Sequence, residues 1–248
     1  MKKLLFFFFA TILFAGCDKS GSDYVNGNGS LNNSAVGASA HDLLSSSKYT
    51  SLKIEIQYMT GFQPDAAALA HLQNTLTALL NKPSGITIIT KEIPVSSSLS
   101  LSLNDVIDIE KTNRTAFTNG TELAVYLLYT NGNYTDNNVL GIAYKNTSTV
   151  LFGKKIGDNS GGIGQASRTK LVATVAEHEL GHLLGLVDLG SNMQTAHKDA
   201  AHGNHCSNTS CLMYYGAETS DILGFLITGN IPVFDANCKA DLTANGGK

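Results

Sequence analysis

Hydrophobic and polar residues alternate in the first regular stretch of the chain, SLKIEIQYM (51–59). A period of two is typical of a strand with one buried face. The apolar side of this strand consists of Leu52, Ile54, Ile56 and Tyr58. Later apolar runs predict further strands, the last of them a hairpin or two short strands, at residues 86–95, 122–130 and 139–152.

Apolar residues spaced three and four apart predict helices between these strands. After Pro64, the stretch 65–82 has one apolar side, formed by Leu69, Leu72, Leu76, Leu79 and Leu80. Further helices are expected at 104–113, 168–185 and 218–229. Ser167 or Thr169 can cap the middle one. Helices that alternate with strands predict an α/β (α+β) domain with a mixed sheet.

The N-terminus has the features of an export signal. Lys2 and Lys3 precede an apolar run (4–14) that is too short to span a bilayer comfortably. The string LFAGC, which ends at Cys17, resembles a bacterial lipoprotein box. This resemblance implies a signal peptide over residues 1–16, a lipidated Cys17, and an exported lipoprotein anchored to a membrane, periplasmic or on the cell surface. The alternative is an ordinary signal peptide in which Cys17 is incidental.

Residues 17–46 are expected to form the lipidated cysteine and a flexible tether, because Gly, Ser and Asn dominate them. A role as a pro-segment remains open. Residues 47–248 would then form one catalytic domain. The formal net charge of the chain is −3, and removal of Lys2 and Lys3 lowers it to −5. This mild acidity gives no reason to expect nucleic acid as a partner.

The string HELGHLLGLVD (178–188) carries the strongest chemical signal. Residues four apart share one face of a helix, so His178 and His182 can bind one metal ion. Glu179 can reach a water on that ion as a general base without being a ligand. Gly185 lets the chain turn, and Asp188 can return to the ion as a third ligand. Five of the seven histidines fall between 178 and 205, which favours a metal site over incidental core histidines.

The same string resembles the long zinc motif of the metzincin metallopeptidases, HExxHxxGxxH, with Asp188 in place of the last histidine, as in snapalysin-type enzymes. CLMYY (211–215) resembles their Met-turn and makes Met213 the methionine beneath the zinc. The resemblance runs from the active-site helix to about residue 215. It implies a metzincin-like, mostly parallel twisted sheet, with an antiparallel edge strand for extended substrate at 139–152. It also implies one catalytic Zn²⁺, and Tyr215, or neighbouring Tyr214, as the oxyanion-stabilising residue.

A second alignment gives a different third ligand. HCSNTSCLM (205–213) resembles the archaemetzincin pattern, in which the third histidine is followed directly by cysteine. This alternative makes His205 the ligand and the segment after Asp188 an insertion. Asp188 is preferred because its spacing is local. His197 and His202 are further candidates, or ligands of a second metal, but a solvated polar loop is the expected interpretation for both.

The cysteines add one more expectation. Cys206 and Cys211 are close enough in sequence for a small disulfide, which export to an oxidising compartment would permit. Cys238 has no assigned partner, and the chain lacks the full cysteine set with which archaemetzincins hold a structural zinc.

These features predict a monomeric zinc endopeptidase that acts on a protein or peptide substrate and contacts a membrane through its N-terminal lipid. One alternative is a catalytically silent surface lipoprotein that keeps the metzincin fold for binding. A zinc amidase is a further, less favoured alternative.

Overall fold

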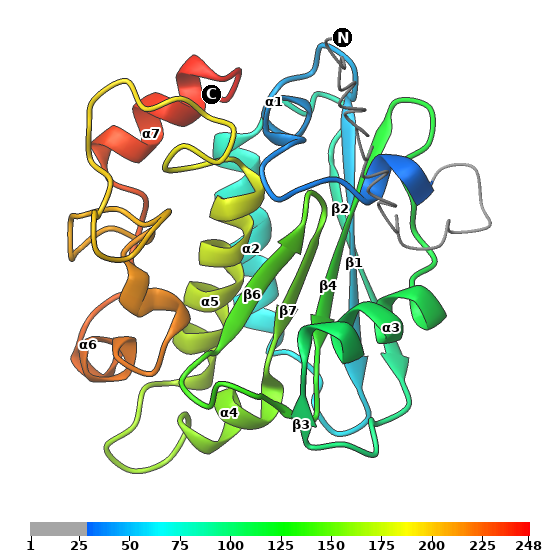
Figure 1. Cartoon of the computed structure of the whole chain (residues 1–248), viewed down its shortest axis with the longest axis vertical. Coiled ribbons are helices and arrows are strands. Elements are labelled where there is room, and N and C mark those ends of the chain that lie inside the picture. Colours follow the sequence, from blue (N-terminus) through cyan, green and yellow to red (C-terminus); the bar gives the residue numbers. More distant parts are fainter. Residues whose placement is uncertain (1–28) are drawn as a thin grey trace, which may run out of the picture.

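The structure is a computed structural model that describes residues 29–248, so the expected signal peptide (1–16) and Cys17 lie outside the described residues. A five-stranded sheet separates two layers of helices (Figure 1). Its order is β2-β1-β4-β7-β6. The first four strands are parallel, and β6 pairs antiparallel with β7 at the edge. The strands are β1 (Ser51–Met59), β2 (Ile86–Ile93), β4 (Glu122–Tyr129), β6 (Gly141–Lys145) and β7 (Ser148–Leu151).

The predicted mixed sheet with an antiparallel edge strand is therefore confirmed, and the hairpin at 139–152 supplies that edge. A separate two-stranded sheet joins β3 (Ser100–Leu101) to β5 (Asn133–Tyr134). Helices α2 (Ala66–Leu79) and α5 (Arg168–Leu183) cover one face of the main sheet. Helix α3 (Leu103–Asn113) covers the other face.

Shorter helical segments complete the fold. They are η1 (Gly29–Asn32), α1 (Ala40–Leu44), α4 (Gly153–Asp158), η2 (Tyr215–Glu218), α6 (Ile222–Thr228) and α7 (Ala236–Ala244). The long helix expected at 218–229 is wrong in extent, because α6 has only seven residues and ends at its C-cap Gly229. Helix α7 has no counterpart among the helices expected from the sequence, and its N-cap Asp235 accepts a hydrogen bond from the Cys238 amide.

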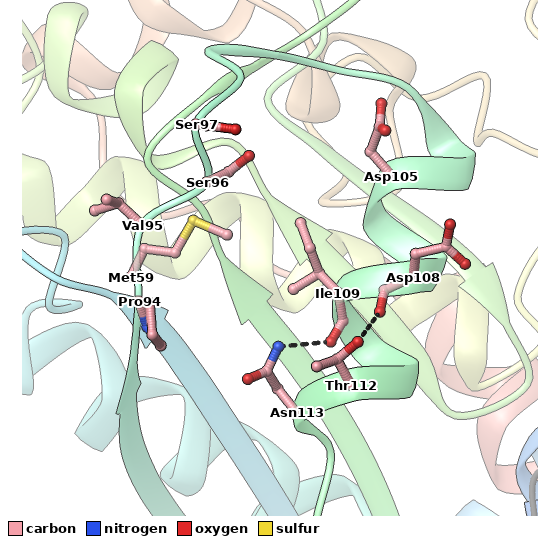
Figure 2. A pocket seen from close by; sticks show the side chains of 10 residues that line it. All are labelled: Met59, Pro94, Val95, Ser96, Ser97, Asp105, Asp108, Ile109, Thr112 and Asn113. Atoms are coloured by element: carbon pink, nitrogen blue, oxygen red, sulfur yellow. Dashed lines mark hydrogen bonds between the residues drawn. The ribbon is translucent and has the colours of Figure 1, made fainter.

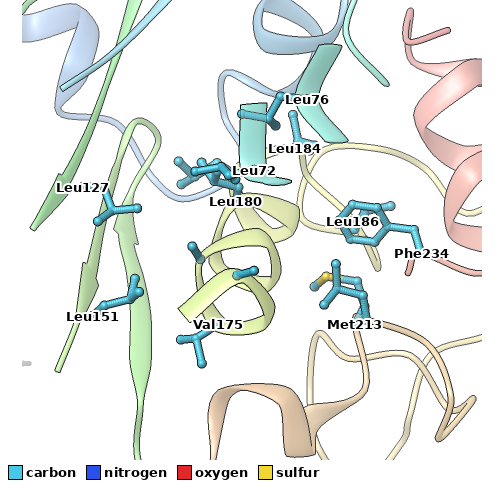
Figure 3. Packing of buried hydrophobic residues seen from close by; sticks show 14 of the residues in the cluster. Leu72, Leu76, Leu127, Leu151, Val175, Leu180, Leu184, Leu186, Met213 and Phe234 are labelled. Atoms are coloured by element: carbon cyan, nitrogen blue, oxygen red, sulfur yellow. The ribbon is translucent and has the colours of Figure 1, made fainter. Parts of the chain in front are cut away.

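The main core lies between the sheet and the pair of helices α2 and α5 (Figure 3). Every residue of α5 from Leu171 to Leu183 is buried. A helix that is buried all round is typical of the centre of a domain, because each of its sides faces another element. Its neighbours in the core include Leu72 and Leu76 of α2, Leu127 and Leu151 of the sheet, and Met213 and Phe234 of the C-terminal part.

The polar side of β1 is also buried, which the alternating pattern alone does not predict. Glu55 and Gln57 are both fully buried and face the layer that contains α3. The Glu55 carboxylate accepts hydrogen bonds from the backbone amides of Thr115 (2.9 Å) and Ala116 (2.6 Å), which follow α3. A buried carboxylate is tolerated when such donors replace water. The alternating side chains of β1 therefore face two buried layers, one on each side of the sheet, and the polar set does not face solvent.

The prediction of a flexible tether is wrong for residues 29–46. Leu43 and Leu44 of α1 are buried in the main core. The Asn32 side-chain amide donates to the carbonyl of Ala124 (3.0 Å) and the hydroxyl of Thr147 (2.9 Å). Local Gly and Ser content gave the wrong prediction because these few long-range contacts fix the segment to the sheet. Across the described part of the chain, every helix is too short or too polar to span a membrane.

Candidate metal centre

Helix α5 positions the first two histidines. Ser167, one of the two predicted caps, accepts a hydrogen bond from the Lys170 amide and fixes the start of the helix. His178 and His182 then lie one turn apart on the same face, with their Nε2 atoms 3.1 Å from each other. Both rings are buried, His178 completely. The helical spacing thus brings two imidazole nitrogens to one point, as the sequence predicted.

His205 reaches the same point from the loop that follows the helix. Its ring stacks on His178 with centroids 5.2 Å apart and lies edge-on to His182 at 5.1 Å. The Nδ1 atom of His205 is 2.6 Å from the carbonyl oxygen of His202, and Nδ1 of His178 is 2.7 Å from that of Leu212. A carbonyl oxygen can only accept, so both Nδ1 atoms donate, and both Nε2 atoms keep a lone pair for a metal.

The protonation state of His182 also suits a metal ligand. Burial lowers the pKa of His182 to about 4, so its imidazole is neutral at neutral pH. Neutral imidazole is the form that binds zinc. For His205, burial alone would lower the pKa, but the Glu218 carboxylate raises it. The three rings, two with their outer nitrogens tied to backbone carbonyls, fit a zinc ion, which bonds to histidine nitrogen at about 2.0–2.1 Å.

Asp188 is not part of this group, which corrects the preferred assignment of the third ligand. Its side chain is exposed, and its backbone has φ of +65°. After Gly185 the chain turns tightly, with the amides of Leu189 (3.1 Å) and Ser191 (2.8 Å) both donating to the Gly185 carbonyl. This turn directs Asp188 towards solvent. The alternative ligand, His205, is the one that the structure brings to His178 and His182.

The loop that carries His205 is packed rather than extended through solvent. The Ser191 hydroxyl donates to the Leu184 carbonyl at 2.7 Å, and the Gln194 amide donates to Asp241 of α7 at 2.7 Å. The Asp199 amide donates to the His205 carbonyl at 2.8 Å. Asp188 was preferred because its spacing is local, whereas His205 requires a longer loop to be ordered. These contacts offset the entropy lost when that loop is ordered.

Glu179 lies beside the three histidines and is completely buried. Neither of its carboxylate oxygens makes a hydrogen bond of normal geometry with the described residues, and the backbone amide of Ala143 in β6 is a nearby donor that favours the charged form. Burial, reinforced by the charge of Glu218, raises the pKa of Glu179 well above its usual value. A buried carboxyl group with so little hydrogen bonding is costly, and such groups are typical of sites that hold water, metal or substrate.

Glu218, at the end of η2, is a site residue that the sequence analysis missed. Its Oε1 lies 3.4 Å from His205 Nε2, and its Oε2 lies 3.6 Å from His178 Nε2 and 3.8 Å from His182 Nε2. Burial alone would raise the pKa of this carboxyl, but the three imidazoles hold it well below its usual range. No local sequence signal marks Glu218 apart from its position five residues after Met213.

Met213 is fully buried and packs beneath α5, near Phe234 (Figure 3). A Cβ atom placed on Gly181, inside the HELGH string, would lie 2.3 Å from the Met213 sulfur. The methionine therefore contacts the helix segment that carries both histidines. Tyr215 lies further out, where its ring stacks on His202 with centroids 3.6 Å apart. Its role as an oxyanion-stabilising residue stays a prediction, as does that of Tyr214, whose ring lies 4.6 Å from Tyr215.

The three described cysteines meet in a second group, next to the first. All are free thiols, so the expected Cys206–Cys211 disulfide is not formed. Cys211 lies instead against Cys238, with sulfurs 3.6 Å apart. Tetrahedral zinc–sulfur bonds of about 2.3 Å place two sulfurs about 3.8 Å apart, whereas a disulfide needs about 2.05 Å. The long-range contact between α7 and the Met-turn brings these residues together, which spacing could not reveal.

His197 and Asp235 complete the surroundings of the thiols. His197 Nδ1 lies 3.3 Å from the Cys206 sulfur, and Asp235 Oδ2 lies 3.5 Å from it. The other nitrogen of His197 pairs with the buried Asp241 carboxylate at 2.7 Å, which orients the ring towards the sulfurs. The expectation of a solvated His197 is therefore wrong. His202 does remain partly exposed and pairs with Asp199.

A cavity of about 250 Å³ opens beside the histidines and has Glu179, His182 and Glu218 in its wall. Ile142 and Ala143 of the edge strand β6 form another side. A larger hollow of about 480 Å³ lies elsewhere, between α3 and the loop after β2 (Figure 2). That hollow is lined by no histidine or cysteine. The smaller cavity is therefore the one in which a histidine and two carboxylates, groups that can bind a metal ion or transfer a proton, lie together.

Comparison with solved structures finds proteins of similar fold. The chain resembles the crystal structure of archaemetzincin from Methanopyrus kandleri with a TM-score of 0.52 and 15% identity, over 79% of this chain and 96% of that one. Metalloproteinase-II from Bacteroides fragilis gives a TM-score of 0.43 and 13% identity, over 82% of this chain and 56% of that one. The sequence matches no protein-family model, and curated proteins gave no significant match. The chain therefore has an archaemetzincin-like fold.

Proposed function

We propose that this chain is a zinc-dependent endopeptidase that hydrolyses peptide bonds in proteins. In this proposal His178, His182 and His205 hold one catalytic zinc ion, and Glu179 is the general base. The observation that carries the proposal is the convergence of three imidazole Nε2 atoms beside a buried carboxylate that makes no hydrogen bond of normal geometry with the described residues.

In this proposal the bound ion, Glu179 and the edge strand β6 have different roles in hydrolysis. Bound zinc would polarise the scissile carbonyl and lower the pKa of water. Glu179 would take a proton from that water and deliver it to the leaving amine. Its raised pKa suits both steps, because the group can hold the proton between them. The edge strand β6 borders the same cavity and has a sheet neighbour on one side only, so an extended peptide could pair along its outer side.

The alternative is a silent protein that uses the same fold only for binding. Glu179 argues against it, because a metal-binding or structural role would not need a poorly hydrogen-bonded carboxyl group buried beside the histidines. A zinc amidase remains less favoured, since a sheet edge beside the cavity suits an extended chain better than a compact substrate.

The thiol group fits a second zinc with a structural role. Three sulfurs and the oriented His197 nitrogen, or the Asp235 carboxylate, supply the four donors of a closed tetrahedral site. Such an ion would link α7 to the loop that carries His205. The wild-type protein should then hold two zinc ions per chain and the Cys238→Ser variant one.

Membrane anchoring through a lipid on Cys17 and a monomeric state are also proposed, from the sequence alone. The test of anchoring is the Cys17→Ser change, which should release the protein into the soluble fraction. Retention of that variant in the membrane would contradict the anchor.

The test of the enzymatic proposal combines zinc content with hydrolysis of an unstructured protein such as casein. We expect zinc-loaded protein to cleave casein, a chelator to stop cleavage, and added zinc to restore it. Zinc binding without cleavage would favour the silent binding protein instead. A protein that binds no zinc would contradict both interpretations.

A further inference from the structure

The carboxylate of Glu218 lies among the three metal-facing nitrogens of the histidine group. Catalytic zinc sites have three protein ligands and leave the fourth position to water or substrate. Here a fourth protein donor reaches the same point, within 3.4–3.8 Å of all three Nε2 atoms. The Glu218 side chain is only 26% exposed, so it lies inside the site rather than over it.

An orienting role does not explain this contact. A carboxylate that orients a histidine ligand binds the ring nitrogen that faces away from the metal. In His178 and His205 that nitrogen already donates to a backbone carbonyl. Glu218 instead approaches the Nε2 atoms, which are the metal-facing ones. The position of general base is filled by Glu179.

The backbone around Glu218 is joined to the edge strand. The Leu140 amide donates to the Glu218 carbonyl at 2.8 Å, and the Ser220 amide donates to the Asn138 carbonyl at 3.1 Å. Val139 and Thr219 form an antiparallel bridge between these two bonds. Residues 138–140 lead directly into β6, the strand beside the cavity. A peptide that pairs with β6 would therefore bind next to the segment that holds Glu218.

We propose that Glu218 is an internal fourth zinc ligand that closes the resting site, and that a substrate must displace it to reach the ion. This inference rests on the proposed function, because it assumes zinc in the histidine group. The exchange would replace one oxygen ligand of the ion by another, so no covalent bond of the chain would be made or broken. An anionic carboxylate also compensates the charge of an ion bound by three neutral imidazoles.

The test compares the full-length wild-type protein with Glu218→Gln, Glu218→Asp and the control Asp221→Asn. Asp221 is an exposed carboxylate three residues further along the same segment, and its side chain does not cap α6. Two quantities are measured, namely zinc affinity against a competing chelator and the affinity of the zinc-loaded protein for acetohydroxamate. Acetohydroxamate binds zinc directly and reports on the open position without turnover.

We expect Glu218→Gln to bind zinc about tenfold or more weakly, as loss of a metal partner typically does. The same variant should bind acetohydroxamate about tenfold more tightly, because the competent open state is no longer a minor one. Glu218→Asp, which keeps the charge but shortens the reach, should behave like Glu218→Gln. Asp221→Asn should match wild type in both measurements.

Unchanged zinc and acetohydroxamate affinities in Glu218→Gln would overturn the inference while leaving the peptidase proposal intact. Wild-type behaviour of Glu218→Asp would also overturn it, because the contribution of Glu218 would then be its charge alone. Failure of the wild type to bind zinc in the histidine group, seen as at most one zinc ion per chain instead of two, would refute the proposed function and this inference together. The three results are distinguishable, because the first two occur only in protein that binds zinc in that group.

Discussion

At the scale of single residues, the centre contains two carboxylates with opposite surroundings. Glu179 is buried without a hydrogen bond of normal geometry to the described residues, and its pKa is raised. Glu218 faces three imidazoles, and its pKa is lowered. Two groups that differ in this way can take different roles at the same pH. Glu179 is suited to accept and release a proton, whereas Glu218 is suited to remain an anion.

Replacing Glu179 by Gln should lower the rate of casein hydrolysis by about 10²- to 10⁴-fold, the usual contribution of a general base. Zinc content should stay at the wild-type level, because Glu179 is not in the group of potential ligands. Metal analysis and initial rates on the same preparation check both statements. Substantial turnover by the zinc-loaded variant would remove Glu179 from the role of base.

The sequence could predict His178, His182 and Glu179 because a single helix determines their relative positions. It could not predict Glu218, since nothing local distinguishes that residue from other surface glutamates. The choice between Asp188 and His205 depended on whether residues 189–204 pack, and that packing uses distant partners such as Asp241.

At the scale of elements, α5 is the part on which the centre is built. Its side chains are buried all round, and the close contact between Gly181 and Met213 places the methionine against the helix segment that carries the histidines. Periodicity predicted this helix and the strands well, because each has a strong apolar pattern. It failed for the C-terminal helices, where α6 ends at Gly229 and α7 has little amphipathic pattern.

Changing Gly181 to Ala should destabilise the fold by about 1–3 kcal/mol, because the new methyl group overlaps the Met213 sulfur. The matched control is Gly224→Ala in α6, where a Cβ meets nothing within 4 Å. There the better helix propensity of Ala should stabilise by about 0.5–1 kcal/mol. Urea unfolding of both variants measures the difference. Equal stabilities of the two variants would contradict the proposed contact between helix and Met-turn.

At the scale of the whole molecule, buried polar contacts join segments far apart in the chain. Glu110 of α3 pairs with Arg114 at 2.7 Å and with Lys145 of the edge strand at 3.0 Å, and all three are buried. Asn32 links the N-terminal segment to the sheet in the same way. The edge strand β6 is thus held by an ion pair on one side of the sheet and borders the cavity on the other.

Replacing Glu110 by Ala should reduce the free energy of unfolding by about 3–5 kcal/mol, because two buried cations lose their shared partner. The control, Lys154→Ala, removes the half-exposed Lys154–Asp158 pair and should cost less than about 1 kcal/mol. Chemical denaturation of each variant measures the loss in the free energy of unfolding. Near-equal losses would mean that the buried group does not stabilise the attachment of β6.

Both the proposed peptidase activity and the proposed role of Glu218 depend on His205 as the third zinc ligand. The measurement is zinc titration against a competing chelator for the His205→Ala and Asp188→Ala variants. We expect His205→Ala to lose the catalytic zinc and Asp188→Ala to keep wild-type affinity, since His205 lies with His178 and His182 while Asp188 is exposed. Loss of zinc from Asp188→Ala with full retention by His205→Ala would contradict this assignment.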